Sequence, residues 1–328
     1  MTEKQTVLSI QDLSISFLAP NGAVNVLDDV SFEIEEGEML GLLGESGAGK
    51  SVLADAVLGL ISDPPGKVTG KVLYYGTDLG RLPEAELSKI RGKEIAMIFQ
   101  DPTSALNPVF RVGHQVAEPL EIHMNLGRKT ALRQVVDFFR RVGIPSAEAR
   151  VANFPHQFSG GMRQRVVISM GITCHPRLLI ADEPTCSLDV TIQAQILELI
   201  RNLVQELHTA VLFIFNDLAV ISHMCRRVLI MYAGQVVEEG PVEVVFEQPR
   251  HPYTQGLIRS IPRLGARRLE PIPGHLPSVH EYLPGCRFYP RCPLQEKDEQ
   301  CTQVRPPLEF LEAKHRVACW KVRPDHAA

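Results

Sequence analysis

The sequence predicts an α/β fold built on a mostly parallel sheet that helices cover on both faces. A helical stretch between about 101 and 175 and a proline-rich end past about 245 interrupt the pattern, which predicts an inserted helical subdomain and a C-terminal appendage. Helical patterns such as the one over 189–207 separate the later strands. The short apolar runs with strand character are 39–44, 95–99, 177–181, 210–215 and 227–234.

The bulk composition sets limits on the class of protein. The chain has 328 residues, enough for one large domain with an appendage or for two modest domains. Its net charge of −4 provides no global basic field for nucleic acid or acidic lipid. The N-terminus lacks the apolar core of a signal peptide, and no apolar run approaches the roughly 18 to 20 residues of a membrane helix. We therefore expect a cytoplasmic location, where the seven cysteines stay reduced.

The elements can be assigned in chain order. Residues 6–17 and 29–35 alternate apolar and polar side chains, like strands of a half-exposed sheet. The buried strand 39–44 ends in glycine, and a helical pattern follows at once. We predict three parts: a core over 1–100 and 176–245, a helical subdomain over 101–175, and a C-terminal tail over 246–328.

The segment GESGAGKS (44–51) matches the phosphate-loop pattern G-x-x-x-x-G-K-[ST] without a mismatch, between a strand and a helix. Its glycines let the backbone curl, so that successive N–H groups can point at an anion. Lys50 is expected to reach the outer phosphates of a nucleoside triphosphate, and the Ser51 hydroxyl to ligate Mg²⁺. A chance glycine-rich turn is disfavoured by the flanking elements. The predicted nucleotide-binding residues of the loop are Gly44, Glu45, Ser46, Gly47, Ala48, Gly49, Lys50 and Ser51.

A second phosphate element is LLIADEP (178–184), an apolar strand that delivers two carboxylates at its C-terminal edge. Open α/β sheets bind ligands at this edge. We expect Asp182 to contact the Mg²⁺ shell and Glu183 to polarise the attacking water.

The segment FSGGMRQR (158–165) narrows the class of nucleotide-binding protein. It closely resembles the signature motif of ABC ATPases, and the further matches follow in the family's order over residues 5 to 245. The resemblance implies an ABC-type fold with antiparallel N-terminal strands, which binds ATP and Mg²⁺. It also implies a dimer in which Ser159, Gly160 and Gly161 of one subunit cap the ATP held by the other. Three further matches carry the resemblance. Gln100 is expected in the Mg²⁺ shell and in the catalytic group, and Phe17 is expected to stack on adenine. The third match is the SLD loop at 187–189.

The strand FIF (213–215) ends in Asn216, before an intact Asp217. In ABC ATPases a histidine usually stands at this place and contacts the γ-phosphate. An asparagine can donate one amide hydrogen bond but cannot become cationic. We therefore expect ATP binding to survive while hydrolysis at this chain's own site is slowed, in a heterodimer with unequal sites. The alternative is that Glu183 carries most of the catalysis and the replacement has little effect.

Two segments resemble the oligopeptide/dipeptide branch of ABC importers: RHPYTQGLIRSIP (250–262) and FQDPTSALNP (99–108). The resemblance implies a peripheral ATPase on the cytoplasmic face of the cell membrane. Its partners would be a second ABC ATPase, two integral permease subunits and an extracytoplasmic solute-binding protein. We expect His251 of the HPY motif to pack the tail against the ATPase domain rather than to bind a metal.

Four of the cysteines crowd into the tail, and three are scattered along the chain as expected buried apolar residues (Cys174, Cys186 and Cys225). Gaps of five, eight and seventeen residues between the tail cysteines fit neither common zinc spacings nor ferredoxin runs. Four thiolates still suggest a soft metal centre, and resemblance to the importer branch implies a 4Fe-4S cluster. Zinc or four reduced thiols stay open as alternatives. The expected ligands are Cys286, Cys292, Cys301 and Cys319.

Two other functions compete with the importer subunit. A soluble ABC ATPase acting on nucleic acid or ribosomes usually carries two ATPase modules or long coiled-coil insertions, and this chain shows one module and no heptads. A non-hydrolysing ATP-binding subunit would fit Asn216, but the intact Glu183 argues against a complete loss of catalysis.

Overall fold

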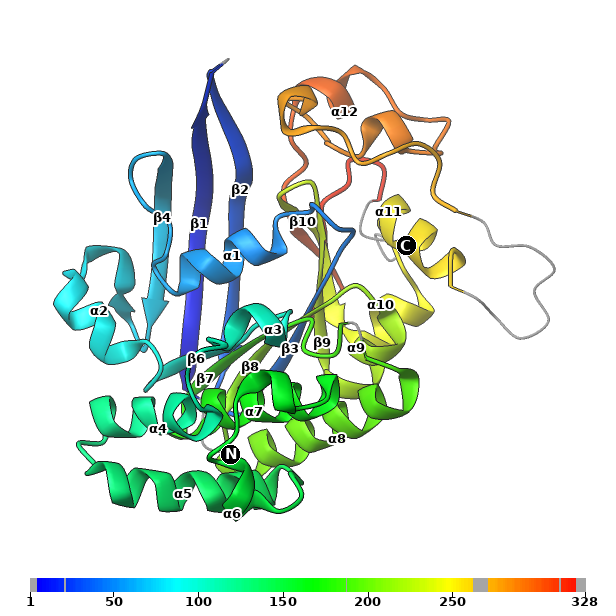
Figure 1. Cartoon of the computed structure of the whole chain (residues 1–328). Helices are drawn as coiled ribbons and strands as arrows, with labels where there is room; N and C mark the ends of the chain where they lie inside the picture. The colour runs from blue at the N-terminus through cyan, green and yellow to red at the C-terminus, as the bar shows by residue number, and fades with distance from the viewer. Residues whose placement is uncertain (1–4, 21, 187, 262–270, 313, 323–328) are drawn as a thin grey trace. The chain divides into compact units, whose positions relative to one another are not determined.

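The computed structural model describes residues 5–20, 22–186, 188–261, 271–312 and 314–322 (Figure 1). Two compact units make up the fold, and each contains segments that are distant in sequence. Unit 1 consists of the described residues within 1–8, 34–38 and 74–213. Unit 2 consists of those within 9–33, 39–73 and 214–328.

Three strands of unit 1 form a short buried ladder. β6 and β7 pair in parallel, with Ile95 opposite Leu178 and Ile98 opposite Ala181. All five residues of β7 are buried, as expected for a strand covered on both faces. The sheet order within this unit is β8, β7, β6. The strands are β5 (Thr77–Asp78), β6 (Ile95–Ile98), β7 (Leu178–Asp182) and β8 (Ala210–Phe215), whose last two residues belong to unit 2.

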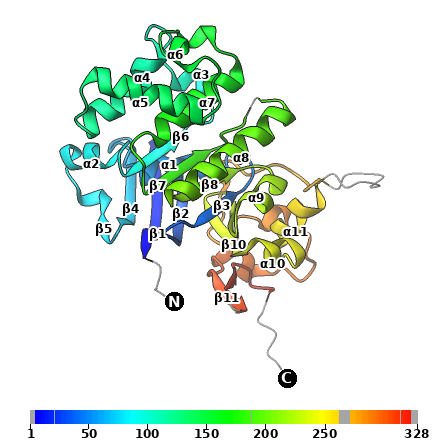
Figure 2. The ribbon, with the colours of Figure 1, turned by 90° about the horizontal axis from the view of Figure 1, so that it is seen from below.

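Helices dominate the middle of unit 1, where the sequence predicts a helical subdomain. α4, α5 and α7 pack on one another, and α6 lies against α5, as both ribbon views show (Figures 1 and 2). α5 buries Ala131, Val135, Phe138 and Phe139 on one face, the spacing of an amphipathic helix. The helices are α2 (Glu84–Ile90), α3 (Pro102–Ala105), α4 (Val112–His123), α5 (Arg128–Arg141), α6 (Ala147–Arg150), α7 (Gly160–Ile172) and α8 (Val190–Leu207).

Unit 2 contains two sheet segments. In one, the strand order is β2, β1, β4. In the other it is β11, β12, β10, β9, β3, and there β3 runs parallel to β9 while β10 runs antiparallel to both β9 and β12. The strands are β1 (Thr6–Ala19), β2 (Gly22–Glu35), β3 (Met39–Leu43), β4 (Gly66–Tyr74), β9 (Arg227–Tyr232), β10 (Gln235–Pro241), β11 (Glu309–Glu312) and β12 (His315–Val317); the ends of β1, β2 and β4 belong to unit 1.

The tail (residues 246–328) is more regular than its composition predicts. Its strand β12 adds to β10, with Val317 opposite Glu238. No local pattern predicts this pairing, because the partner strand lies about eighty residues away in sequence. The helices of unit 2 are α1 (Lys50–Val57), α9 (Leu218–Met224), α10 (Val242–Glu247), α11 (Pro252–Arg259) and α12 (Glu299–Gln303), and Figure 2 shows α10 and α11 near β10.

A buried carboxylate fixes the tail to this sheet. Glu238 of β10 is fully buried and accepts hydrogen bonds from the backbone N–H groups of Arg250 and His251, at 2.8 and 2.9 Å. His315 Nε2 lies 2.8 Å from the same carboxylate. A buried carboxylate with several such partners is stabilised where an isolated one would not be.

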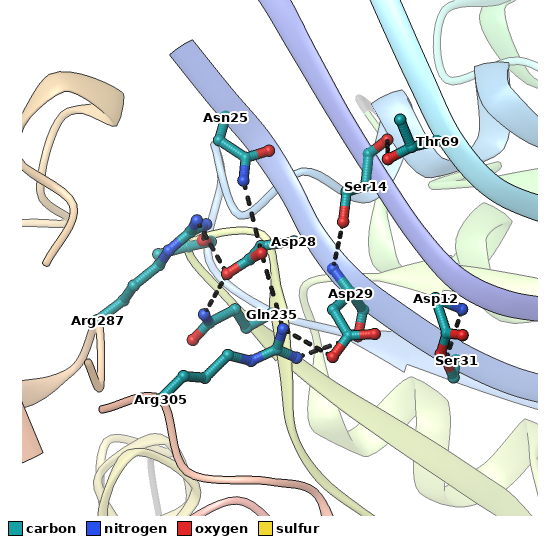
Figure 3. Close-up of polar contacts among 11 residues, drawn as sticks. Asp12, Ser14, Asn25, Asp28, Asp29, Ser31, Thr69, Gln235, Arg287 and Arg305 are labelled. Carbon is teal, nitrogen blue, oxygen red and sulfur yellow. Dashed lines mark hydrogen bonds and ion pairs between the residues drawn. The ribbon is translucent and has the colours of Figure 1, made fainter. Parts of the chain in front are cut away.

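A second attachment joins the tail to β2 (Figure 3). Arg287 lies 3.3 Å from the Asp28 carboxylate, which also accepts a 2.7 Å hydrogen bond from Gln235. Arg305 pairs with Asp29 at 3.0 Å. The tail is thus held by charge pairs from its middle part and by strand pairing through β12.

Candidate functional site

The phosphate loop (44–51) joins the buried strand β3 to helix α1, which begins at Lys50 as expected. Gly49 precedes the helix with a φ of 102°, a backbone conformation that favours glycine. Gly44 is required for another reason, because a Cβ there would lie 2.3 Å from the carbonyl oxygen of Met231. The Ala48 N–H donates to the Glu45 carbonyl at 3.1 Å, which closes the turn. The sequence motif therefore adopts the curled loop that the pattern predicts.

Lys50 is buried, with 6% of its surface exposed, and its ammonium faces three oxygens. It donates to the carbonyls of Gly44 and Glu45 at 2.8 and 3.0 Å, and to Asn216 Oδ1 at 2.7 Å. The structure thus brings together the phosphate-loop lysine and the asparagine that stands where ABC ATPases usually have histidine. Asn216 acts here as a hydrogen-bond acceptor for a cation, which a protonated imidazole could not do.

Asp217, the next residue, has a separate task. Its side chain accepts a 2.8 Å hydrogen bond from the Ala219 N–H and so caps helix α9. The cap fixes the chain direction directly after Asn216.

The predicted catalytic carboxylate lies in unit 1, at the end of β7. Asp182 is buried as the last residue of the strand, and Glu183 follows with a φ of 42°. Gln100 Nε2 donates to Glu183 Oε2 at 3.0 Å, so two predicted site residues are in contact. Gln100 also lies 3.7 Å from Cys186 Sγ. Cys186 is only half-buried, so its prediction as a buried apolar residue is wrong, whereas Cys174 and Cys225 are buried.

The predicted signature residues begin helix α7. Ser159 is its N-cap, and the Ser159 side chain accepts a 3.3 Å hydrogen bond from the Met162 N–H. A Cβ at Gly161 would lie 2.9 Å from Ile192 Cγ2 of α8, whereas one at Gly160 would meet Leu188 at an ordinary 3.7 Å. Of the adjoining SLD loop, Asp189 caps α8 through the Ile192 N–H, while Ser187 lies outside the described residues.

Phe17 lies half-buried on β1, and its ring borders Gly66, where a Cβ would lie 3.2 Å from Phe17 Cε1. Its expected role as a platform for adenine stays a prediction.

The tail contributes contacts to the phosphate loop that the sequence does not predict. Tyr253 of the HPY motif is fully buried, and its hydroxyl oxygen accepts the backbone N–H of Glu45 at 3.0 Å. Arg291 donates to both carboxylate oxygens of Glu45, at 3.0 and 3.1 Å. Through Tyr253 the HPY motif packs the tail on the phosphate loop, whereas the sequence predicts this contact for His251. The only sequence signal for Arg291 is its position next to Cys292.

The four tail cysteines line one cavity, here called the cysteine cavity, together with apolar and aromatic side chains such as Phe288 and Trp320. Burial, reinforced by the neighbouring thiols, raises the pKa of Cys286 to about 12. Burial also raises the pKa values of Cys292 and Cys319. Among the described residues, the side chains as placed form no group of three or more that could hold a metal ion.

His251 also lines the cysteine cavity. Its Nδ1 accepts the Tyr253 N–H at 3.1 Å and so begins helix α11, whereas its Nε2 is buried without a hydrogen-bond partner among the described residues. Desolvation lowers the pKa of His251 to about 4, so the ring is neutral. With Nδ1 accepting, the neutral ring carries its proton on Nε2.

A hollow of about 630 Å³ lies in the helical part of unit 1. It falls within the FQDPTSALNP region and reaches Phe110, a side chain that is 56% exposed. Val109 beside it is 70% exposed. Neighbouring exposed apolar side chains of this kind are typical of an interaction surface. Residues that line the hollow include Thr103, Leu106, Asn107, Phe110, Gln115 and Met170.

Comparisons with known proteins agree with this site. The family profile described as ABC transporter matches residues 27–186, and that described as oligopeptide/dipeptide transporter, C-terminal region, matches residues 237–301. The oligopeptide transport ATP-binding protein OppD of Bacillus subtilis is 46% identical over 323 residues, which cover 97% of this chain and 90% of that protein. The dipeptide transport ATP-binding protein DppD of the same organism is 44% identical over 328 residues, with 98% and 97% covered.

The solved structures confirm the predicted fold. A bacterial ABC transporter cassette solved as a dimer matches with a TM-score of 0.64 at 24% identity, over 72% of this chain and 98% of that one. Within the described residues, every helix is too short or too polar to cross a membrane.

Proposed function

Because the chain belongs to the ATP-binding proteins of ABC transporters, in their oligopeptide/dipeptide branch, we propose that its ATPase activity drives the import of peptides or similar small solutes. The observation that carries the proposal is the phosphate loop between β3 and α1, with Lys50 buried at its mouth. A buried ammonium that donates to neutral oxygens can donate to an anionic phosphate in their place.

Each predicted residue has a role in this proposal. The phosphate loop and Lys50 bind the phosphates of ATP, and Phe17 stacks on adenine. Ser51, Gln100 and Asp182 hold Mg²⁺, which neutralises phosphate charge when bound. Glu183 polarises the attacking water, and its contact with Gln100 orients the carboxylate for that task.

We infer that the working form contains a second ABC ATPase. The N-terminus of α7, capped by Ser159 and carrying Gly160 and Gly161, would bind the ATP held by that partner. ATP binding then closes the dimer, and hydrolysis allows it to open. Closure is therefore an equilibrium between two states that the bound nucleotide shifts.

The membrane partners follow from the same proposal. The hollow bordered by Phe110 fits a helix presented by an integral permease subunit. Two such subunits, with a solute-binding protein on the outer side, would complete the importer, and this chain would be peripheral on the cytoplasmic face. Nucleic acid has no part in this assembly.

The Asn216 site is the place where hydrolysis is slowed. Asn216 Oδ1 accepts a hydrogen bond from Lys50, and the Asn216 side chain carries no positive charge to offer a phosphate. The ATP site of this chain would therefore bind ATP and hydrolyse it slowly, and the partner's site would supply most of the turnover.

We propose that Cys286, Cys292, Cys301 and Cys319 hold a 4Fe-4S cluster in the cysteine cavity. The four side chains line one cavity, and a buried His251 N–H there lacks a partner. An unpaired buried donor is costly, and a cluster sulfur or thiolate would accept it. A bound cluster would replace the thiol protons and hold together a segment with little core of its own.

The decisive experiment combines co-purification with one substitution. We expect the tagged chain to co-purify with integral permease subunits. With the partner's ATP site silenced, Glu183→Gln should keep ATP affinity while lowering the remaining turnover at this chain's own site at least about a hundredfold. Glu206→Gln, which alters a surface pair with Arg141, is the matched control and should behave like the unaltered chain. Recovery of RNA or DNA in place of permeases would contradict the proposal.

A further inference from the structure

We infer that Tyr253 and Arg291 of the tail are positioning residues of the ATP site, which hold the phosphate loop in its binding conformation through Glu45. This inference rests on the proposed ATPase function and extends the site beyond the family's nucleotide motifs. It assigns a role to the tyrosine of the HPY motif and to the arginine that precedes Cys292.

Glu45 is contacted at three different groups. Its backbone N–H donates to Tyr253 Oη at 3.0 Å. Its carbonyl oxygen accepts from Lys50 Nζ at 3.0 Å. Its carboxylate accepts from Arg291 at 3.0 and 3.1 Å. The first and third contacts come from the tail, so the tail determines both the peptide orientation and the side-chain direction of this loop residue.

The Tyr253 contact is rigid because the ring is confined. Tyr253 packs against Tyr232 and Phe288, with ring centroids 4.6 and 5.4 Å apart. All three side chains are at most 1% exposed. A hydroxyl held by such packing cannot follow the loop if the loop moves, so it acts as a fixed acceptor.

The Arg291 contact is similarly constrained. Its side chain is 6% exposed and lies 5.7 Å from the Tyr232 ring, and its Nε donates to the Pro273 carbonyl at 2.9 Å. Glu45 is the partly exposed member of the pair, with 28% of its side chain accessible. A buried guanidinium that loses its carboxylate is left with an uncompensated charge, so the pair resists opening.

Leu276 gives a third contact from the tail. A Cβ placed on Gly47 would lie 3.2 Å from Leu276 Cδ2, so the tail borders the loop at a second residue. A loop that must curl around phosphates loses conformational freedom on binding. Contacts that hold it curled beforehand reduce that cost and raise the apparent affinity.

The test measures Mg²⁺-ATP affinity of the full chain by calorimetry, for Tyr253→Phe, Arg291→Gln and Glu45→Gln. We expect each to weaken binding about tenfold, the effect of losing one positioned hydrogen bond or charge pair. In the assembly with the partner's ATP site silenced, the KM for ATP should rise while kcat stays within about twofold, because the loop makes the same contacts with ATP before and during the reaction. Arg291→Lys, which keeps the charge, should recover part of the affinity.

Two substitutions in the same tail serve as controls. Tyr282→Phe removes a hydroxyl from a ring that packs on Arg287, and Arg305→Gln breaks the pair with Asp29. Both should leave ATP affinity unchanged. Thermal unfolding of every variant separates loss of fold from loss of affinity.

The double variant Glu45→Gln with Arg291→Gln decides whether the pair acts as a unit. We expect it to bind ATP no more weakly than either single variant. Independent, additive losses would overturn the assignment of Arg291, and unchanged affinity in Tyr253→Phe would overturn that of Tyr253. If the unaltered chain fails to bind Mg²⁺-ATP, the proposed function fails as well, which distinguishes the two results.

Discussion

At the scale of single residues, Asn216 is the departure from the family pattern with the clearest consequence. Its Oδ1 accepts from Lys50 Nζ at 2.7 Å, which places the amide beside the phosphate-loop lysine. The amide also lacks the positive charge that an imidazolium would offer to a phosphate oxygen. Under the proposal of a slowed site, this missing charge would reduce the stabilisation of developing negative charge there.

We predict that Asn216→His raises ATP turnover at this chain's own site by about tenfold or more, because one positioned transition-state contact is restored. The measurement is steady-state hydrolysis by the assembled importer, in which the partner's own site has been silenced. Asn216→Ala is the control: it removes the pairing with Lys50 without supplying a new donor, and it should not raise turnover. Equal rates for the His variant and the unaltered chain would show that Glu183 suffices.

The residues of the site differ in how far the sequence could predict them. Lys50 and Glu183 follow from local motifs, because Lys50 closes the phosphate-loop pattern and Glu183 comes directly after a buried strand. Tyr253 and Arg291 do not, because they reach Glu45 from more than two hundred residues away in sequence. No periodicity or spacing encodes a contact of that kind, so only the folded chain reveals it.

At the scale of elements, the two glycines that open α7 differ in what they tolerate. Gly161 packs against α8, where a Cβ would come within 2.9 Å of Ile192 Cγ2. Gly160 has an ordinary distance of 3.7 Å to Leu188. The signature motif alone does not distinguish the two glycines, whereas the packing of α7 on α8 leaves room for a side chain only at Gly160.

We predict that Gly161→Ala lowers the free energy of unfolding by about 1 kcal/mol or more through overpacking against Ile192. Gly160→Ala is the matched control and should be neutral or stabilising by about 0.5 kcal/mol, because alanine favours a helix. Denaturant unfolding of the full chain measures both. Equal effects of the two substitutions would contradict the packing difference.

Helix α11 depends on an uncharged histidine cap. His251 Nδ1 accepts the Tyr253 N–H, and burial lowers the pKa of His251 to about 4. On acidification the unfolded chain takes up this proton first, near pH 6.5, since the folded state disfavours the charged ring. The stability that the cap provides is therefore complete above about pH 6.5 and falls progressively as the pH drops toward 4.

We predict that His251→Asn removes this part of the acid dependence. Asparagine is a good helix cap and does not titrate. Between pH 6.5 and 4, the free energy of unfolding of the variant should therefore fall by up to about 3 kcal/mol less than that of the unaltered chain. The comparison is between two denaturation series over that range. Parallel curves would show that His251 does not contribute to the acid transition.

At the scale of the whole molecule, the sequence predicts the sheet and helix content better than the tail. The strands from β6 to β9 lie within one residue of the predicted ranges at their N-terminal ends, because buried parallel strands are continuous apolar runs. The tail strand β12 is only three residues long, and its pairing with β10 depends on the buried Glu238 and His315 rather than on strand propensity. Short elements held by distant polar contacts leave no local signal.

The last prediction concerns the group in the cysteine cavity. We predict that the chain purified without oxygen is brown and contains about four irons and four sulfides, and that Cys292→Ser abolishes both while Cys174→Ala, at a buried cysteine outside the cavity, does not. Because Arg291 adjoins Cys292 and contacts Glu45, loss of the cluster should also weaken Mg²⁺-ATP binding several-fold. If elemental analysis finds zinc instead of iron, the cavity holds a structural zinc ion and not the cluster. A colourless, metal-free chain with full ATP affinity would show that packing alone, through Tyr253 and Phe288, suffices to hold the tail against the phosphate loop.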